Sequence, residues 1–147
     1  MTAVPAVVKA AAEKAAPKAK LTKAMMEIEH GQKVYELQGM MDGKKIEVDV
    51  MEDGRVDEIE TEIMMDAVPA EVSAALKKRV PDFKPKFIEK SERPMMAAGG
   101  GAGDGEAEVY YEFEGQEGEM ACDVEVSADG KTLLIEENDD KDERAEK

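Results

Sequence analysis

Carboxylates are the side chains of this sequence that could carry chemistry, because 35 acidic residues stand against 20 basic ones and give a formal charge of -15. In two stretches they alternate with apolar residues, which places them on one face of a β-strand. An acidic face attracts a basic protein surface, and nucleic acid is excluded as a partner because its binding requires clustered lysine and arginine. We expect these positions to form a solvated, protein-binding face: Glu36, Gln38, Glu47, Asp49, Tyr110, Glu112, Glu114, Asp123 and Glu125.

The sequence shows no assembled catalytic site, so we predict that the protein is not an enzyme. His30 is the only histidine and stands beside Gly31, as a surface turn residue does. Cys122 is the only cysteine and alternates onto the apolar side of its strand, where a thiol behaves as a small buried hydrophobe. The glycine run at 99–105 lacks the Lys-Ser/Thr of a phosphate-binding loop. We therefore expect no catalytic residues and no cofactor.

Metal ligands are present only in weaker patterns. Asp42, Asp53 and Asp129 precede glycines and could offer oxygen ligands to calcium, although Asp-Gly is also ordinary hairpin chemistry. Thioethers suit Cu(I), but neighbouring residues on a strand point to opposite faces, and methionine also fills gaps in cores. The methionines number 11 and include the adjacent pairs Met25-Met26, Met40-Met41, Met64-Met65 and Met95-Met96. A divalent cation stays open as a second kind of partner, with no metal ligand assigned.

Two turns fix the strands that carry the carboxylates. Asp42-Gly43 and Asp53-Gly54 are flanked by alternating residues and predict hairpins. A two-residue turn at Asp42-Gly43 pairs apolar residues with each other, and a slip of one residue would send them all to the polar face. The predicted pairs are Leu37 with Val48, Tyr35 with Val50, Val48 with Ile59, Phe113 with Val124, Tyr111 with Val126, and Val124 with Ile135.

An internal repeat relates the two halves of the chain. Val4-Pro5-Ala6 recurs at 68–70, and the Tyr-Glu-X-X-Gly segment at 35–39 recurs at 111–115. The fold class is therefore predicted as α+β, with two tandem repeats that each pack an N-terminal helix on a three- to four-stranded antiparallel sheet. The expected boundaries are 1–66 for the first repeat, 67–137 for the second with a Gly-rich insertion at 94–105, and 138–147 for a disordered acidic tail.

Helices are expected directly after each Val-Pro-Ala, because proline suits the first turn of a helix. Val8 and Ala12 in the first half, and Val72, Leu76 and Val80 in the second, recur every four residues and form one apolar stripe per helix. A fourth strand in each half is expected at 23–30 and at 86–92. No apolar run approaches the roughly 20 residues of a membrane-spanning helix, so we expect no membrane insertion.

The order of these segments resembles the PepSY-like domain family, whose members are described as β-lactamase-inhibitor-like. The resemblance covers 4–137 as both repeats and is carried by four segments: Val34-Tyr35-Glu36-Leu37, Glu47-Val48-Asp49-Val50, Tyr111-Glu112-Phe113-Glu114 and Asp123-Val124-Glu125-Val126. It implies a periplasmic or secreted protein without known catalytic residues that binds or inhibits another protein. The first twelve residues lack the pattern of a secretory signal, and the Gly-rich insertion also departs from the family.

Two functional hypotheses follow. The first is a non-enzymatic extracytoplasmic binding module, of the kind that inhibits a protease or hydrolase, whose acidic sheet face contacts a basic protein partner. The alternative is an extracytoplasmic metal-handling protein for calcium or Cu(I). Metal-dependent thermal stability distinguishes the two, because an ion that binds only the folded state raises the unfolding midpoint.

Overall fold

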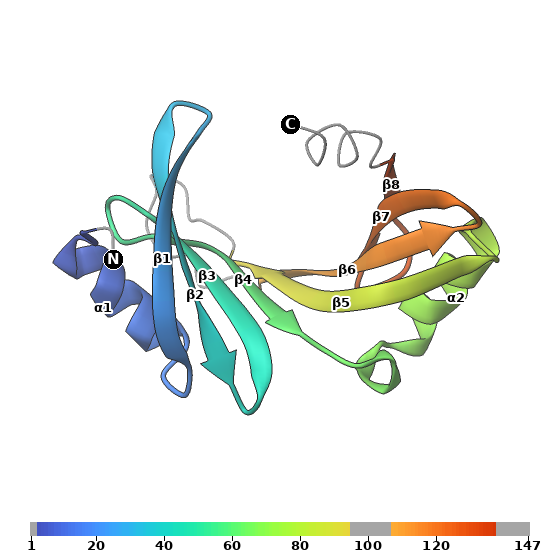
Figure 1. Ribbon diagram of the computed structural model, residues 1–147, viewed down its shortest axis with the longest axis horizontal. Helices are drawn as coiled ribbons and strands as arrows, with labels where there is room; N and C mark the ends of the chain where they lie inside the picture. The colour runs from blue at the N-terminus through green and yellow to red at the C-terminus, as the bar shows by residue number, and fades with distance from the viewer. Residues whose placement is uncertain (1–2, 95–106, 138–147) are drawn as a thin grey trace. The chain divides into compact units, whose positions relative to one another are not determined.

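The computed structural model describes residues 3–94 and 107–137 (Figure 1). The predicted Gly-rich insertion, apart from residue 94, and the predicted tail at 138–147 lie outside the described residues. The elements run α1 (Ala6–Ala15), β1 (Lys20–Glu29), β2 (Gln32–Met41), β3 (Lys44–Met51), β4 (Val56–Glu62), a 3-10 helix η1 (Met65–Ala67), α2 (Ala70–Arg79), β5 (Phe83–Arg93), β6 (Glu108–Glu117), β7 (Met120–Ser127) and β8 (Leu133–Glu137). The predicted α+β class is confirmed.

The eight strands form one antiparallel sheet in which they follow one another in chain order. The chain also divides into two compact units, residues 1–62 with 91–108 and residues 63–90 with 109–147. Strand β5 therefore contributes residues to both units. The tandem-repeat organisation stays a prediction, and each unit is described by itself below.

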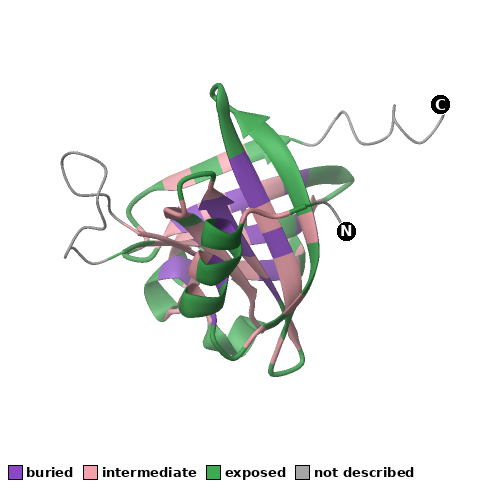
Figure 2. Cartoon of the chain, turned by 90° about the vertical axis from the view of Figure 1, so that its left-hand side faces the viewer, coloured by how far each residue is buried: buried purple, intermediate pink, exposed green. Residues whose placement is uncertain are grey.

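In the N-terminal unit, α1 begins after Pro5 and buries the predicted stripe of Val8 and Ala12. These residues pack with Tyr35, Leu37 and Val48 from strands β2 and β3. The buried apolar positions of this unit's sheet lie on β2 and β3, and Figure 2 shows buried residues in purple among intermediate and exposed ones. Each fully buried aliphatic side chain of this kind contributes about 1.5–3 kcal/mol relative to an exposed one. The carboxylates consequently lie on the side of the sheet away from the helix.

The Asp42-Gly43 turn has the predicted two residues, because Met41 pairs with Lys44. Both turn residues have positive φ, +52° and +78°, as a type I′ turn requires. The predicted pairs of Leu37 with Val48, Tyr35 with Val50 and Val48 with Ile59 are confirmed.

The loop at Asp53-Gly54 is longer than a two-residue hairpin turn. A bulge between Asp49 and Val50 shifts the register, so that Val50 pairs with Val56. The backbone N–H of Met51 donates to the carbonyl of Arg55, which closes the loop over four residues. The turn residues therefore located this hairpin correctly, but they did not show its bulge.

In the C-terminal unit, α2 begins after Pro69 and buries Val72 and Leu76, and Val80 is buried at its end. Phe113 is fully buried in the same core. The three predicted register pairs are confirmed: Phe113 with Val124, Tyr111 with Val126, and Val124 with Ile135. Cys122 lies opposite Gly115 and is fully buried, and burial raises the pKa of its thiol, as a structural cysteine requires.

The predicted fourth strands are present as β1 and β5, both longer than the sequence indicated. No helix in the described part of the chain is long and apolar enough to cross a membrane.

Candidate functional site: two acidic sheet faces

The first candidate surface, the N-terminal acidic face, lies on strands β2, β3 and β4. Cross-strand pairing places its side chains directly opposite each other, with Asp49 between Glu36 and Glu58. The face consists of Glu36, Gln38, Glu47, Asp49, Glu58 and Glu60. The sequence-predicted residues of this half are thus brought together by the register of the two hairpins.

Asp49 departs from the expected solvated face, because only 9% of its surface is exposed. It occupies the middle strand of the face and is flanked on both sides by the longer side chains of glutamates. Its Oδ1 atom is inaccessible and has no hydrogen-bond partner among the described residues. The expectation that the whole face is solvated is therefore wrong at this position.

The charged groups around Asp49 are negative, and they raise the pKa values of carboxyl groups on the face. Burial, together with the charges of Glu47 and Glu36, raises the pKa of Asp49 to about 9. Burial and the charges of Glu47 and Glu27 raise the pKa of Glu36 to about 7. Asp49 also shares a hydrogen bond with the Glu47 carboxyl group, which requires a proton on one of the two. At neutral pH the face therefore holds at least one carboxyl group in its neutral form.

Two residues that the sequence did not single out bind Glu58 at one end of this face. The Ser91 hydroxyl, which is fully buried, donates to Glu58 Oε1 at 2.5 Å, and Arg93 Nε lies 3.6 Å from the same oxygen. Both belong to the end of strand β5. Their pairing with β4 leaves no signal in the local sequence, because η1 and α2 lie between β4 and β5 along the chain.

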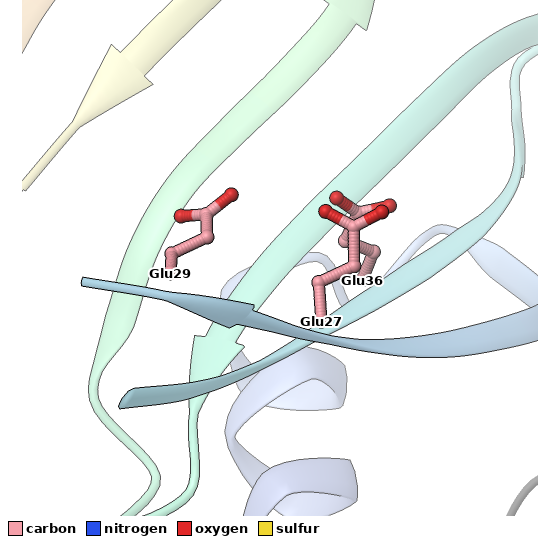
Figure 3. Close-up of side chains that lie close together, drawn as sticks. All are labelled: Glu27, Glu29 and Glu36. Carbon is pink, nitrogen blue, oxygen red and sulfur yellow. The ribbon is translucent and has the colours of Figure 1, made fainter. Parts of the chain in front are cut away.

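Ser91 and Glu58 are 33 positions apart in the chain, so local sequence patterns could not predict their contact. Two acidic neighbours of Glu36 on strand β1, in contrast, could have been predicted. Glu27 and Glu29 lie on the same side of the sheet as Glu36, because Met25 pairs with Glu36. Carboxylate oxygens of the three glutamates lie within 4.8 Å of one another (Figure 3). The His30-Gly31 turn was the sequence signal for this pairing of β1 with β2. Its two residues have positive φ angles of +50° and +79° and set the register. The structure confirms His30 as an exposed turn residue.

The second candidate surface, the C-terminal acidic face, lies on strands β6 and β7. Glu112 pairs with Glu125, Glu114 pairs with Asp123, and Tyr110 pairs with Ser127. The predicted residues of this half therefore also share one face, which consists of Tyr110, Glu112, Glu114, Asp123 and Glu125. Asp123 Oδ1 is inaccessible and has no hydrogen-bond partner among the described residues.

A hollow of about 270 Å³ opens on the C-terminal acidic face. Two apolar side chains that the sequence analysis missed, Phe87 from β5 and Leu134 from β8, contribute to its wall. The acidic residues that line it are Glu89, Glu112, Glu114, Asp123, Glu125 and Glu136. Neither lysine nor arginine is among its described lining residues. The hollow thus combines apolar surface with a concentration of negative charge.

Comparison with solved structures identifies the fold that presents these faces. A BLIP-like protein from Bacteroides fragilis superposes with a TM-score of 0.67 at 20% identity, over 96% of this chain and 92% of the other. The fold is similar to that of BLIP-like proteins. A DUF2874 family protein from Bacteroides ovatus gives a TM-score of 0.70 at 13% identity, over 93% of this chain and 89% of the other.

A third structure with the same fold, from Bacteroides eggerthii, has been described as periplasmic; its TM-score is 0.67 at 18% identity, over 92% of this chain and 89% of the other. No protein-family profile matches the sequence, and neither does any curated protein. At these identities the comparisons establish the BLIP-like fold, and the resemblance to PepSY-like domains stays a prediction.

Within this BLIP-like fold, the turn aspartates act as turn residues. Asp53 Oδ1 accepts the backbone N–H of Arg55 at 3.0 Å, and its Oδ2 lies 2.6 Å from Arg55 Nε. Asp129 Oδ1 accepts the backbone N–H of Lys131 at 2.9 Å and the Ser127 hydroxyl at 2.7 Å. These two donors lower the pKa of Asp129. The carboxylates are therefore engaged by their own loops.

The methionine pairs are dispersed over the described part of the chain. Met25 and Met26 are adjacent on β1 and exposed, so their side chains point to opposite sides of the strand. Met40 is exposed near the end of β2, and Met64 and Met65 are exposed around η1. The fourth pair, Met95-Met96, lies outside the described residues. Cu(I) binding by these pairs stays a prediction.

Proposed function

We propose that this chain is a non-enzymatic, extracytoplasmic protein-binding module, and that the hollow on its C-terminal acidic face takes a basic side chain of the partner. The BLIP-like fold supports a role in protein binding. The similar structure from Bacteroides eggerthii, which has been described as periplasmic, supports an extracytoplasmic location. The observation that carries the proposal is the combination of Phe87, Leu134 and Asp123, whose Oδ1 is unpaired, in the wall of one hollow.

The chemistry of the hollow selects arginine as the anchoring side chain. Its guanidinium group presents several N–H donors in a flat fork that matches carboxylates, and its plane also stacks on aromatic rings. Asp123 supplies a carboxylate whose hydrogen-bonding capacity is not filled by the described residues, and Phe87 supplies the ring. The volume of about 270 Å³ lies below the range typical of pockets for drug-sized ligands, so one side chain fits better than a cofactor.

Long-range attraction adds to this contact. The chain has a formal charge of -15, which speeds encounter with a basic surface and makes the rate depend on salt. The inhibitory form of this function, in which the bound partner is a protease or hydrolase, is the narrower version of the proposal. It rests on the resemblance to β-lactamase-inhibitor-like domains.

A short arginine-rich peptide tests the hollow directly, with the citrulline peptide of the same sequence as an uncharged control. Calorimetry should show binding of the arginine peptide to the wild type. The double variant Asp123→Lys/Glu125→Lys should weaken it at least about tenfold more than Glu47→Lys/Asp49→Lys, which changes the net charge equally. Phe87→Ala should also weaken it.

Equal losses in the two double variants would show that the general negative field binds the peptide and that the hollow does not. The same pair of variants, used as bait against proteins of the native host, then asks whether the hollow selects a natural partner. A partner retained by both double variants contradicts an acidic binding face altogether.

A further inference from the structure

Asp49 presents a second unsatisfied acceptor, and its environment differs from that of Asp123. Its side chain is nine-tenths buried, yet Oδ1 lacks any hydrogen-bond partner among the described residues. The ligand oxygens of Glu36, Glu47 and Asp49 lie within 4.8 Å of one another. The Asp49 side chain that carries the unpaired oxygen therefore belongs to a compact group of three carboxylates on two paired strands.

The neighbours of this group do not neutralise it. The Gln38 side chain, which is neutral, donates a hydrogen bond from Nε2 to Glu47 Oε2 at 2.6 Å. No ion pair within the described residues involves Glu36, Glu47 or Asp49. Glu58, on the next strand, has both Ser91 and Arg93. Because a buried carboxylate without a counter-charge is costly, the group requires a cation or a proton.

We propose that Glu36, Glu47 and Asp49 bind one calcium ion on the N-terminal acidic face. Calcium takes six to eight oxygen ligands at about 2.3–2.6 Å, so two oxygens on one ion are at most about 5 Å apart. The three carboxylates meet this limit. Glu36 and Glu47 are half-buried and therefore more accessible than Asp49, so water can supply the remaining ligands.

The donor set also excludes softer metals at this site. Zinc and Cu(I) prefer nitrogen and sulfur ligands, and the group offers only oxygens. Magnesium demands near-ideal octahedral geometry and gives up its water reluctantly, which suits three side chains fixed on a sheet less well than the flexible coordination of calcium. The site uses residues other than those of the arginine hollow, so it stands or falls independently of the proposed function.

Thermal unfolding with CaCl2 tests the site, with NaCl and MgCl2 at matched ionic strength as controls. At a calcium concentration about ten times the dissociation constant, the wild-type midpoint should rise by about 3 °C or more, and calorimetry should show one ion bound per chain. Asp49→Asn should remove this rise. Asp123→Asn, the matched variant of the other unpaired aspartate, should keep it.

A second pair of variants guards against indirect effects. Glu36→Gln and Glu47→Gln should each weaken calcium binding about tenfold, because each removes one charged ligand. The proposal is overturned if NaCl or MgCl2 reproduces the calcium shift, or if Asp49→Asn retains it. Loss of peptide binding without loss of calcium binding, or the reverse, separates this site from the hollow.

Discussion

The two acidic faces have the same cross-strand layout but differ in where the short side chain stands. In the N-terminal face the residue opposite Glu36 is Asp49, whereas the residue opposite Glu112 in the C-terminal face is Glu125. The aspartate of the C-terminal face is Asp123, opposite Glu114. Both aspartates carry an inaccessible, unpaired Oδ1. One oxygen of each of these short side chains is shielded from water, so the position of the aspartate decides where each face has an unsatisfied acceptor.

The surroundings of the two aspartates then lead to different chemistry. Asp49 is surrounded by carboxylates, which raise its pKa to about 9, together with its burial. Asp123 shares its hollow with Phe87 and Leu134, so apolar surface accompanies the charge. An all-oxygen group suits a small, hard cation, and a mixed surface suits an organic cation such as arginine. Similar patterns of acidic residues therefore do not imply the same ligand.

The largest loss of stability is expected from substitutions that prevent the close approach of neighbouring strands. A Cβ atom at Gly39 would lie 1.9 Å from the Lys20 carbonyl oxygen, and one at Gly115 would lie 2.1 Å from that of Lys84. Gly39→Ala and Gly115→Ala should therefore each lower the free energy of unfolding by about 3 kcal/mol or more. Urea denaturation measures both.

Gly31→Ala provides the control for this pair, because a Cβ there meets nothing within 4 Å although its φ is +79°. It should cost about 1 kcal/mol from backbone strain alone. If Gly39→Ala were as mild as Gly31→Ala, the close approach of β1 to β2 would be wrong.

The next largest effect should come from removing the charge of Asp49. Asp49→Asn keeps the size of the side chain, and its amide group can donate to a neighbouring carboxylate. The variant should be more stable than the wild type by about 1–3 kcal/mol at pH 8 without calcium. Asp123→Asn should gain less, because Asp123 is less buried than Asp49. Equal gains in urea denaturation would remove the distinction between the two faces.

The pH dependence of the free energy of unfolding should reflect the raised pKa values of Asp49 and Glu36. The pKa of Asp49 rises from 3.8 to about 9 on folding, and that of Glu36 rises from 4.5 to about 7. Between these values the folded chain binds more protons than the unfolded chain, so the free energy of unfolding falls as pH increases from about 4 to 9. Denaturation at several pH values measures this slope.

Asp49→Asn should flatten the upper part of that slope, between pH 7 and 9, and leave the part due to Glu36. A wild type whose stability increases over this range would contradict the raised pKa values. Calcium should reduce the slope in the wild type, because a bound ion replaces the proton on the carboxylates.

Much of this architecture could be predicted from local sequence. The Asp42-Gly43 turn and the alternation around it were sufficient to pair Leu37 with Val48 and thereby to place the carboxylates on one face. The helices followed from proline and a four-residue apolar spacing. These features depend on residues close together in the chain, for which turn chemistry and periodicity leave a direct signal.

The functional detail depended on longer-range information. The alternation that identifies Asp49 as a face residue also suggests that it is solvated, and only the neighbouring strands reveal that it is buried. Phe87 lies on β5 and Leu134 on β8, outside the strands β6 and β7 that carry the predicted acidic residues, and the sequence offered no reason to join them. Burial and counter-charges are properties of the assembled sheet, so alternation alone could not supply them.

The smallest effect is expected when the residue at one position of a face is replaced by its counterpart from the other face. Gln38 stands opposite Glu47, where the C-terminal face has Glu114 opposite Asp123. Gln38 Nε2 donates to Glu47 at 2.6 Å, so Gln38→Glu replaces this hydrogen bond with repulsion and should cost about 0.5–1.5 kcal/mol at pH 8. The same variant should bind calcium more tightly, since it adds a carboxylate beside the three proposed ligands. Glu114→Gln, the reciprocal change, should leave calcium binding unchanged, and an effect there would place the ion on the other face.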